Sequence, residues 1–193
     1  MTAPSSQTRA AGEPRARGAG LLDRDRAALV VVDVREGFRS YEAFASMAAA
    51  CGRLVDGARI LGVPIVATAQ YPKGLGPVVP EVGLGEDVKP VEKTVFSAAR
   101  AEGFDLGGRD QAIVCGIEAH ICVSQTVHDL LERGVEVHVA RDAVTSRTEA
   151  NRELGLHKME GSGAVLTSVE TALFELLGAA GTDEFKRVQE LVK

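Results

Sequence analysis

Aromatic residues are scarce in this sequence, which has no tryptophan, two tyrosines and six phenylalanines among 193 residues. Proteins that bind single-stranded nucleic acid or sugars use aromatic side chains as stacking platforms. The charge balance points the same way, because 27 acidic residues outnumber 22 basic ones and no basic run is present. We therefore expect no nucleic-acid partner.

Cysteines and long apolar segments are also few. Three cysteines cannot build a disulfide framework, and their odd number favours a reducing compartment with room for one reactive thiol. No apolar stretch reaches the roughly 18 residues that a membrane span needs. The N-terminal residues lack the hydrophobic segment of a secretory signal. These absences predict a cytoplasmic protein without a membrane partner.

The N-terminal residues 1–25 differ in composition from the rest. From Met1 to Gly20 the chain is built mainly of Ala, Ser, Pro, Gly and Arg. We interpret this segment as a disordered or weakly ordered tail that is free to pack on a partner subunit. An arginine-rich transit peptide is the weaker alternative, because Pro4, Glu13 and Pro14 interrupt any helix. Residues 26–193 are predicted to form a single domain, since no linker divides them.

Strand-like and helix-like segments alternate from residue 27 onward. The β-branched run that ends at Val32 is typical of a strand buried on both faces of a parallel sheet. Short links between strands and helices predict βαβ units with right-handed crossovers. We expect a three-layer α/β/α fold with an open, mostly parallel sheet of five to six strands and helices on both faces. The predicted strands cover residues 28–32, 65–68, 112–116, 135–140 and 163–167, and the predicted helices 42–61, 121–132, 149–159, 170–177 and 183–192.

Three residues whose side chains could take part in catalysis lie at or near strand ends, where an open parallel sheet forms its binding crevice. Asp33 directly follows the first strand, Cys122 lies just beyond the third, and Lys93 follows a long loop over residues 71–90. Each residue alone has an ordinary interpretation: a turn aspartate, a small buried hydrophobe and a solvated surface lysine. Their common position is what makes them candidates for one site.

Cys122 is the strongest candidate for a reactive thiol. It follows a short loop and lies at the predicted start of a helix, where the helix dipole and free N–H groups would lower a thiol pKa. The same N–H groups are suited to hold an oxyanion. Cys51, in an alanine-rich helix, and Cys115, inside an apolar strand, are interpreted as structural.

The flanks of these residues carry a family resemblance. They read VVVDVREGF, KTVFSAARAEGF and GIEAHICVSQTVHDLLERGVEVHVARDAVTSR. Together they resemble the isochorismatase-like cysteine hydrolase superfamily, over almost the whole span from Asp25 to Val192. Within it the isochorismatase domain-containing group is the most similar, through ATAQYPKGLGP, GIEAHICV and SGAVLTSVETALFELL.

The resemblance implies a mechanism. Cys122 would attack an amide or carbamoyl carbon to give a thioester-type intermediate. Asp33 would move the proton, and Lys93 would hold the other two in register. A cis peptide at Ile117–Glu118 would direct the N–H groups of Glu118 and Cys122 at the oxyanion. The superfamily commonly has Thr or Ala at position 118, so a charged side chain at the pocket rim would alter substrate choice.

Two departures from the superfamily narrow the class. True isochorismatases lack the nucleophilic cysteine that this chain has, which disfavours isochorismate as the substrate. Nicotinamidases carry Asp and His metal ligands in and after the loop that follows the second strand. Here that loop supplies one carboxylate, Glu81, and no histidine. We therefore expect neither a metal nor another cofactor.

The predicted site is a small, partly apolar pocket for a small-molecule substrate. Its expected lining is Phe38, Gln70, Tyr71, Phe96 and His120, with a structural hydrogen bond favoured for His120. The leading hypothesis is a metal-independent hydrolase of C–N bonds in amides, ureides or carbamoyl compounds. The alternatives are a catalytically weak member with a binding or scaffolding role, and a redox-sensing thiol.

The resemblance also implies a homo-oligomer, a dimer or larger. The helices after residue 168 carry apolar side chains that could cover a neighbouring subunit or their own sheet. These are Leu173, Phe174, Leu176, Leu177, Phe185, Val188, Leu191 and Val192.

Overall fold

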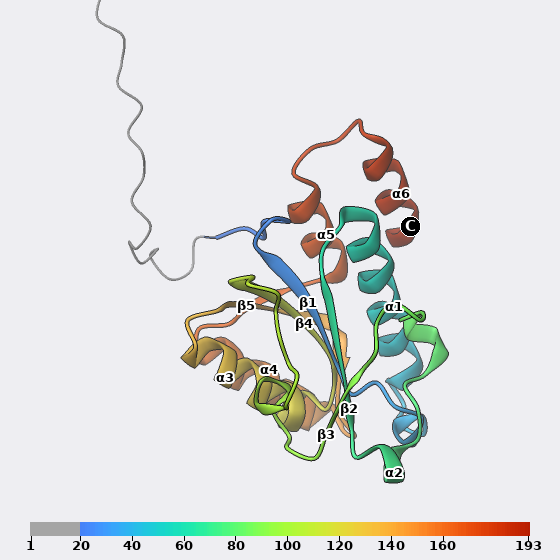
Figure 1. Cartoon of the computed structure of the whole chain (residues 1–193), viewed down its shortest axis with the longest axis vertical. Coiled ribbons are helices and arrows are strands. Elements are labelled where there is room, and N and C mark those ends of the chain that lie inside the picture. Colours follow the sequence, from blue (N-terminus) through green and yellow to red (C-terminus); the bar gives the residue numbers. More distant parts are fainter. Residues whose placement is uncertain (1–19) are drawn as a thin grey trace, which may run out of the picture.

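The computed structural model describes residues 20–193, and its core is a sheet of six parallel strands (Figure 1). The strand order is β3-β2-β1-β4-β5-β6, so the chain starts in the middle of the sheet and winds outward in both directions. The predicted three-layer α/β/α fold is confirmed. The strands are β1 (Ala27–Val32), β2 (Ile65–Gln70), β3 (Val91–Lys93), β4 (Gln111–Ile117), β5 (Glu136–Thr145) and β6 (Val165–Thr167).

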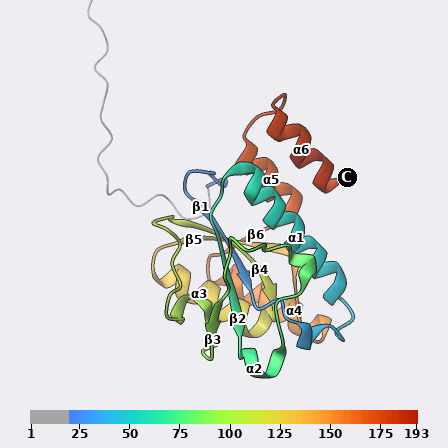
Figure 2. The same ribbon diagram turned by 45° about the vertical axis from the view of Figure 1, so that its right-hand side comes forward.

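Helices cover both faces of this sheet (Figures 1 and 2). Helices α1, α5 and α6 pack on one face, and α3 and α4 on the other. A short helix, α2, lies in the long loop after β2, which the sequence analysis treated as irregular. The helices are α1 (Phe44–Leu61), α2 (Pro72–Leu75), α3 (Ser124–Glu132), α4 (Glu149–Gly161), α5 (Val169–Leu177) and α6 (Asp183–Val192).

The position of β1 in the middle of the sheet explains why its sequence is apolar throughout. Leu29 and Val31 belong to the core under α1, whereas Val30 and Val32 belong to the core under α3 and α4. All six residues of β1 are buried. A central strand that is covered on both faces has no solvent side and shows no polar alternation.

Two predicted boundaries are wrong. Strand β5 continues to Thr145 instead of ending at residue 140. Its register with β4 is interrupted, since Val114 pairs with Val139 but Gly116 pairs with Val144. The inserted stretch includes exposed charged residues that read as a loop. The helix expected from residue 121 is also different, because a π-helical turn (Ala119–Val123) precedes α3.

The segment that precedes β1 packs on the core of the domain, near the amino ends of the strands. The predicted tail falls mostly on residues 1–19, which lie outside the described residues. Leu22, upstream of the predicted boundary at residue 26, is already buried, and its N–H donates to Glu175.

Within residues 20–193, no helix combines the length and the apolar character needed to cross a bilayer.

Much of the apolar surface of α5 and α6 serves the protein's own core. Leu173, Leu176 and Val188 are buried against α1 and the sheet. Phe174 is partly exposed and stacks edge-to-face on Phe185, with ring centroids 6.1 Å apart. The buried side chains are not available to a neighbouring subunit, which leaves Phe174 as the main apolar side chain that this pair of helices exposes.

Candidate active site

Asp33 lies at the carboxyl end of β1, with its side chain fully buried. Its φ of 55° lies in the left-handed region, which aspartate tolerates better than most residues. This conformation ends the strand and turns the carboxylate into the molecule. One carboxylate oxygen, Oδ1, accepts a hydrogen bond of 2.8 Å from the hydroxyl of Thr68 on β2.

Lys93, the last residue of β3, fills the other half of this buried pair. Its Nζ donates to Asp33 Oδ2 at 2.6 Å and to Gln70 Oε1 at 2.5 Å. The carbonyls of Val95 and Phe96 also accept from it, at 3.2 and 2.9 Å. Both charged side chains are 0% exposed. A buried ion pair is tolerated when its remaining hydrogen-bonding positions are satisfied, and here they are.

Cys122 sits in the π-helical turn that precedes α3, with 7% of its surface exposed. Burial and, after it, the negative charge of Asp33 raise the pKa of its thiol to about 12, although the positive charge of Lys93 acts in the opposite direction. This corrects the expectation of a low pKa. Cys122 is not at the start of α3 itself, and burial together with the nearby carboxylate outweighs the cation. The resting thiol is neutral, so a nucleophilic role requires a base, and Asp33 is the adjacent one.

Alkylation by iodoacetamide should report this thiol pKa directly. A thiol with a pKa of about 12 gains about tenfold in thiolate per pH unit. We therefore expect the rate at Cys122 to rise about tenfold per unit from pH 7 to pH 10, without a plateau. Cys51 and Cys115 are fully buried and should react only after unfolding, which intact-mass analysis with peptide mapping will show. A plateau near pH 7 would contradict a neutral resting thiol.

Gly116 places the loop that carries Cys122, residues 118–123, hereafter the Cys122 loop. Gly116 has a φ of 119°, and a Cβ there would lie 2.0 Å from the carbonyl oxygen of Val32. Only glycine permits this approach of β4 to β1. The Ile117–Glu118 peptide bond that follows is cis. The Cys122 loop thus leaves the sheet directly beside the strand that ends at Asp33.

The sequence analysis expected the side chain of Glu118 at a pocket rim, but the structure buries it. Its side chain is 5% exposed and forms an ion pair of 2.7 Å with Arg147, just after β5. Burial alone would raise the pKa of the Glu118 carboxyl, but hydrogen bonds from Arg147 outweigh burial and lower it. A charged residue is accommodated here because a partner from another segment meets it inside the protein.

The five predicted pocket residues make separate contacts in the structure. Gln70 binds the Lys93 ammonium, and His120 Nδ1 lies 3.0 Å from Ser146 Oγ, the structural contact favoured for it. Phe38 packs on Tyr41 and the core, whereas Tyr71 is more than half exposed. The sequence could not show which way each of these side chains turns.

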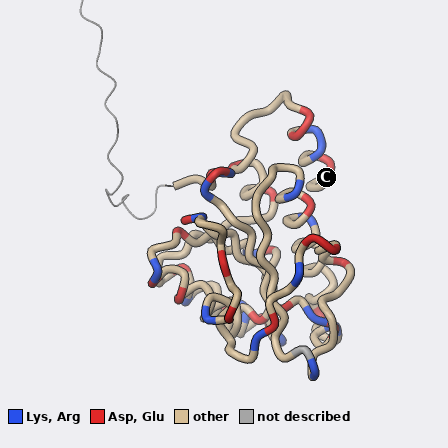
Figure 3. The backbone as a smooth tube through the Cα atoms, viewed as in Figure 1, with Lys and Arg blue, Asp and Glu red and all other residues tan. Residues whose placement is uncertain are grey.

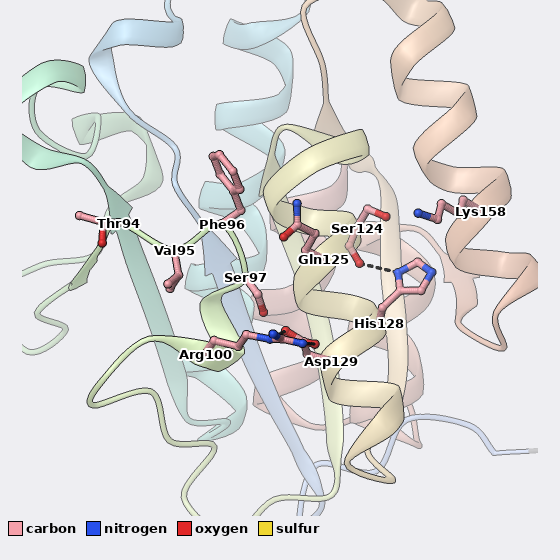
Figure 4. A pocket seen from close by; sticks show the side chains of 10 residues that line it. All are labelled: Thr94, Val95, Phe96, Ser97, Arg100, Ser124, Gln125, His128, Asp129 and Lys158. Carbon is pink, nitrogen blue, oxygen red and sulfur yellow. Dashed lines mark hydrogen bonds and ion pairs between the residues drawn. The ribbon is translucent and has the colours of Figure 1, made fainter.

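Phe96 does line a cavity, an open one of about 540 Å³ beside the segment that binds Lys93 (Figure 4). The exposed side chains of Val95 and Phe96 face it from one side, and Ser124, His128 and Lys158 from the other. The carbonyls of Val95 and Phe96 hold the Lys93 ammonium. One short segment therefore connects the cavity to the buried ion pair.

Several residues of this site were missed by the sequence analysis. Thr68 resembles any β-branched residue of a buried strand, and nothing local indicates that its hydroxyl meets Asp33. Ser146 and Arg147 lie in a segment that the resemblance included, but no role was assigned to them. Arg35 is 2% exposed, with its Nε unpartnered, and burial lowers its pKa. Pairing between distant segments is what local patterns cannot show.

Among residues 20–193, no group of three or more His, Cys, Asp or Glu side chains is arranged to hold a metal ion. Glu81, the carboxylate of the long loop, is bound by the guanidinium of Arg39 at 2.7 and 3.1 Å.

Known proteins share both the sequence and the fold. A sequence model of the isochorismatase domain matches residues 27–171. Isochorismatase domain-containing protein 2 of Bos taurus is 42% identical over 168 residues, covering 86% of this chain and 82% of its own. The MAR1 ribonuclease of Caenorhabditis elegans is 40% identical, with a TM-score of 0.83, covering 90% of this chain and 92% of its own. The YcaC gene product of Escherichia coli, at 25% identity and a TM-score of 0.74, covers 87% and 85%. The chain belongs to the isochorismatase family of hydrolases.

Proposed function

We propose that this protein is a metal-independent cysteine hydrolase that cleaves a C–N bond in a small amide, ureide or carbamoyl compound. The observation that carries the proposal is a fully buried ion pair between Asp33 and Lys93, whose charges both act on the thiol of Cys122. A buried carboxylate held by an ammonium and a hydroxyl is a fixed base. A thiol beside it is a nucleophile that becomes reactive as its proton leaves.

The proposed reaction has two halves. Asp33 takes the thiol proton as Sγ of Cys122 attacks the carbonyl carbon, and a C–S bond forms while the carbonyl oxygen becomes negative. The N–H groups of Glu118 and Cys122 hold that oxygen. The C–N bond then breaks, and Asp33 returns the proton to the leaving amine. In the second half, Asp33 takes a proton from water as the water oxygen attacks the thioester carbon. The C–S bond then breaks, and Asp33 passes the proton to Sγ, which restores the thiol of Cys122 and the carboxylate of Asp33.

A redox-sensing role fits the site less well. Sensor cysteines are exposed and have a lowered pKa, since thiolate is the form that oxidants attack. Cys122 is 93% buried with a pKa of about 12. A scaffolding role with a vestigial site would not explain the buried Asp33–Lys93 pair, because apolar side chains of similar volume in place of both residues would give equal or greater stability.

Hydrolysis of RNA is a second candidate, because one relative at 40% identity is called a ribonuclease. A groove for RNA needs clustered positive charge. This chain has a net charge of −5, and Figure 3 shows acidic and basic residues interspersed along the backbone. We therefore favour a small-molecule substrate and no nucleic-acid partner.

Intact-mass spectrometry tests the proposal. The protein is incubated with a panel of small amides, ureides and carbamoyl compounds and quenched in acid, and an acyl adduct is sought on Cys122. We expect an adduct with at least one compound, and none with Cys122→Ala. A single-stranded RNA in the same series separates the second candidate. RNA cleavage that persists in Cys122→Ala, with no acyl adduct from any compound, would overturn the proposal.

Activity on a confirmed substrate should survive removal of metal ions. A thiol that attacks a carbonyl held by two N–H groups needs no Lewis acid. We expect unchanged turnover after prolonged treatment with EDTA and no stoichiometric metal by elemental analysis. Loss of activity that zinc, iron or manganese restores would show that a metal takes part.

We also propose that the protein is a cytoplasmic homo-oligomer. Its relative in Escherichia coli is described as an octameric hydrolase, and the three cysteines of this chain are free. The exposed Phe174 and Phe96 are apolar surface that a neighbouring subunit would cover. Sedimentation at micromolar concentration should show a species larger than the 20.3 kDa monomer.

A further inference from the structure

Arg147 binds the Cys122 loop through the side chain of Glu118. Its Nε and Nη2 donate to Glu118 Oε1 and Oε2 at 3.0 and 2.7 Å, and its backbone N–H donates to Oε1 at 3.0 Å. The Glu118 side chain is 5% exposed, whereas that of Arg147 is 53% exposed. Two parallel hydrogen bonds from a guanidinium fix a carboxylate in orientation as well as in distance. The first residue of the Cys122 loop is therefore held in one place.

Two further contacts reach the same loop from the same part of the chain. Ser146 Oγ lies 3.0 Å from His120 Nδ1. On α4, a Cβ at Gly155 would lie 2.6 Å from the carbonyl oxygen of Ala119, so the helix backbone packs directly on the loop. The segment after β5 and helix α4 together form an outer wall for the Cys122 loop.

The charges around Cys122 show why Arg147 matters for the site. The groups that act on the thiol are Asp33 from β1, Lys93 from β3 and Glu118 from its own loop. His120 also helps to lower the pKa of the Glu118 carboxyl. Arg147 keeps the buried Glu118 carboxylate paired. If it were unpaired, Glu118 would have to move toward water or take up a proton, because a lone buried charge is costly. Movement toward water would displace the peptide group of Glu118, and protonation would weaken the hydrogen bonds that hold its carboxyl group.

We propose that Arg147 is a positioning residue for the reaction at Cys122. By holding Glu118, it keeps the N–H groups of Glu118 and Cys122 directed at the carbonyl oxygen under attack. This inference rests on the proposed function and deepens it. A displacement of about 1 Å in a reacting group can cost about a hundredfold in rate, and loss of one oxyanion donor costs a similar factor.

Two probes of Cys122 test the inference without knowledge of the substrate. With p-nitrophenyl acetate, Sγ forms a C–S bond to the carbonyl carbon, the C–O bond to p-nitrophenolate breaks, and the thiol proton passes to Asp33. That step passes through an oxyanion. Iodoacetamide forms a C–S bond at a saturated carbon and releases iodide, with no oxyanion. Arg147→Ala should therefore slow acylation by about tenfold or more while alkylation changes by less than about threefold.

The controls separate positioning from general damage. Arg147→Lys keeps the positive charge but loses the two parallel hydrogen bonds to Glu118. It should therefore recover part of the acylation rate that is lost in Arg147→Ala. Arg26→Ala removes a similar fork to Asp110 at the opposite edge of the sheet and should leave both rates unchanged. Equal slowing of both probes in Arg147→Ala and in Arg147→Lys, or no slowing of acylation, would overturn the inference. If neither probe modifies Cys122 in the wild-type protein, the proposed function fails and this inference fails with it.

Discussion

Replacing Asp33 by asparagine should stop turnover and at the same time make Cys122 easier to alkylate. Asparagine keeps one acceptor oxygen for the Lys93 ammonium, and its amide N–H can donate to the Thr68 hydroxyl instead of accepting from it. Asparagine cannot take a proton. The loss of a general base costs about 10²- to 10⁴-fold. The negative charge that helps to raise the thiol pKa also disappears, so the thiol pKa falls and the iodoacetamide rate at pH 8 rises.

These opposite signs distinguish a base from a structural residue. Turnover is measured on a substrate from the adduct screen, and alkylation is measured by intact mass. Cys122→Ala should abolish both, and the double variant should lose little beyond either single variant, because the two groups act as one unit. Wild-type turnover in Asp33→Asn would remove Asp33 from the mechanism, and slower alkylation would contradict the assigned charge effect.

Replacing Lys93 by methionine should destabilise the protein by about 3–5 kcal/mol, the range for removing one partner of a buried ion pair. The ammonium binds four acceptors, including a carboxylate that is 0% exposed. Without it, Asp33 and Gln70 lose their shared donor. Urea denaturation followed by circular dichroism gives the change in the free energy of unfolding.

A matched control is available nearby. Lys89, four residues upstream, is exposed, and Lys89→Met should change the stability by less than about 0.5 kcal/mol. The double variant Asp33→Asn, Lys93→Met should recover part of the stability lost in Lys93→Met, because no unpaired carboxylate remains. If Lys93→Met and Lys89→Met are equally stable, the pair is not the buried, dependent unit described above.

The sequence predicted the elements with strong local patterns and missed those that depend on distant partners. The apolar run of β1 and the amphipathic helices required only their own residues. Strand β3 was missed because two of its three residues are charged, and its Lys93 resembles a surface residue until Asp33 is known to face it. The far half of β5 was missed because Arg141 and Asp142 are charged and exposed, as in a loop.

The candidate site shows the same division. A carboxylate, an ammonium and a thiol near strand ends were predicted, because the ends of parallel strands converge at one edge. The thiol pKa was predicted with the wrong sign, since burial and the net effect of several charges are properties of the assembled site. The hydroxyl of Thr68 and the guanidinium of Arg147 come from strands and loops that no spacing rule links to Cys122.

The ion pair between Arg24 and Glu184, at 3.0 Å, has a practical consequence for handling the protein. It joins the segment that enters β1 to the first turn of α6, at the edge of the sheet opposite the carboxyl ends of the strands (Figure 1). Helix α6 and the C-terminus lie in the upper part of that view, and β1 and β2 run downward from there. Asp33 follows the carboxyl end of β1, and Lys93 ends β3. A surface anchor or fusion partner attached to the C-terminus would lie away from the carboxyl ends of the strands, where the candidate site is, so immobilised protein should be suitable for screening compound libraries.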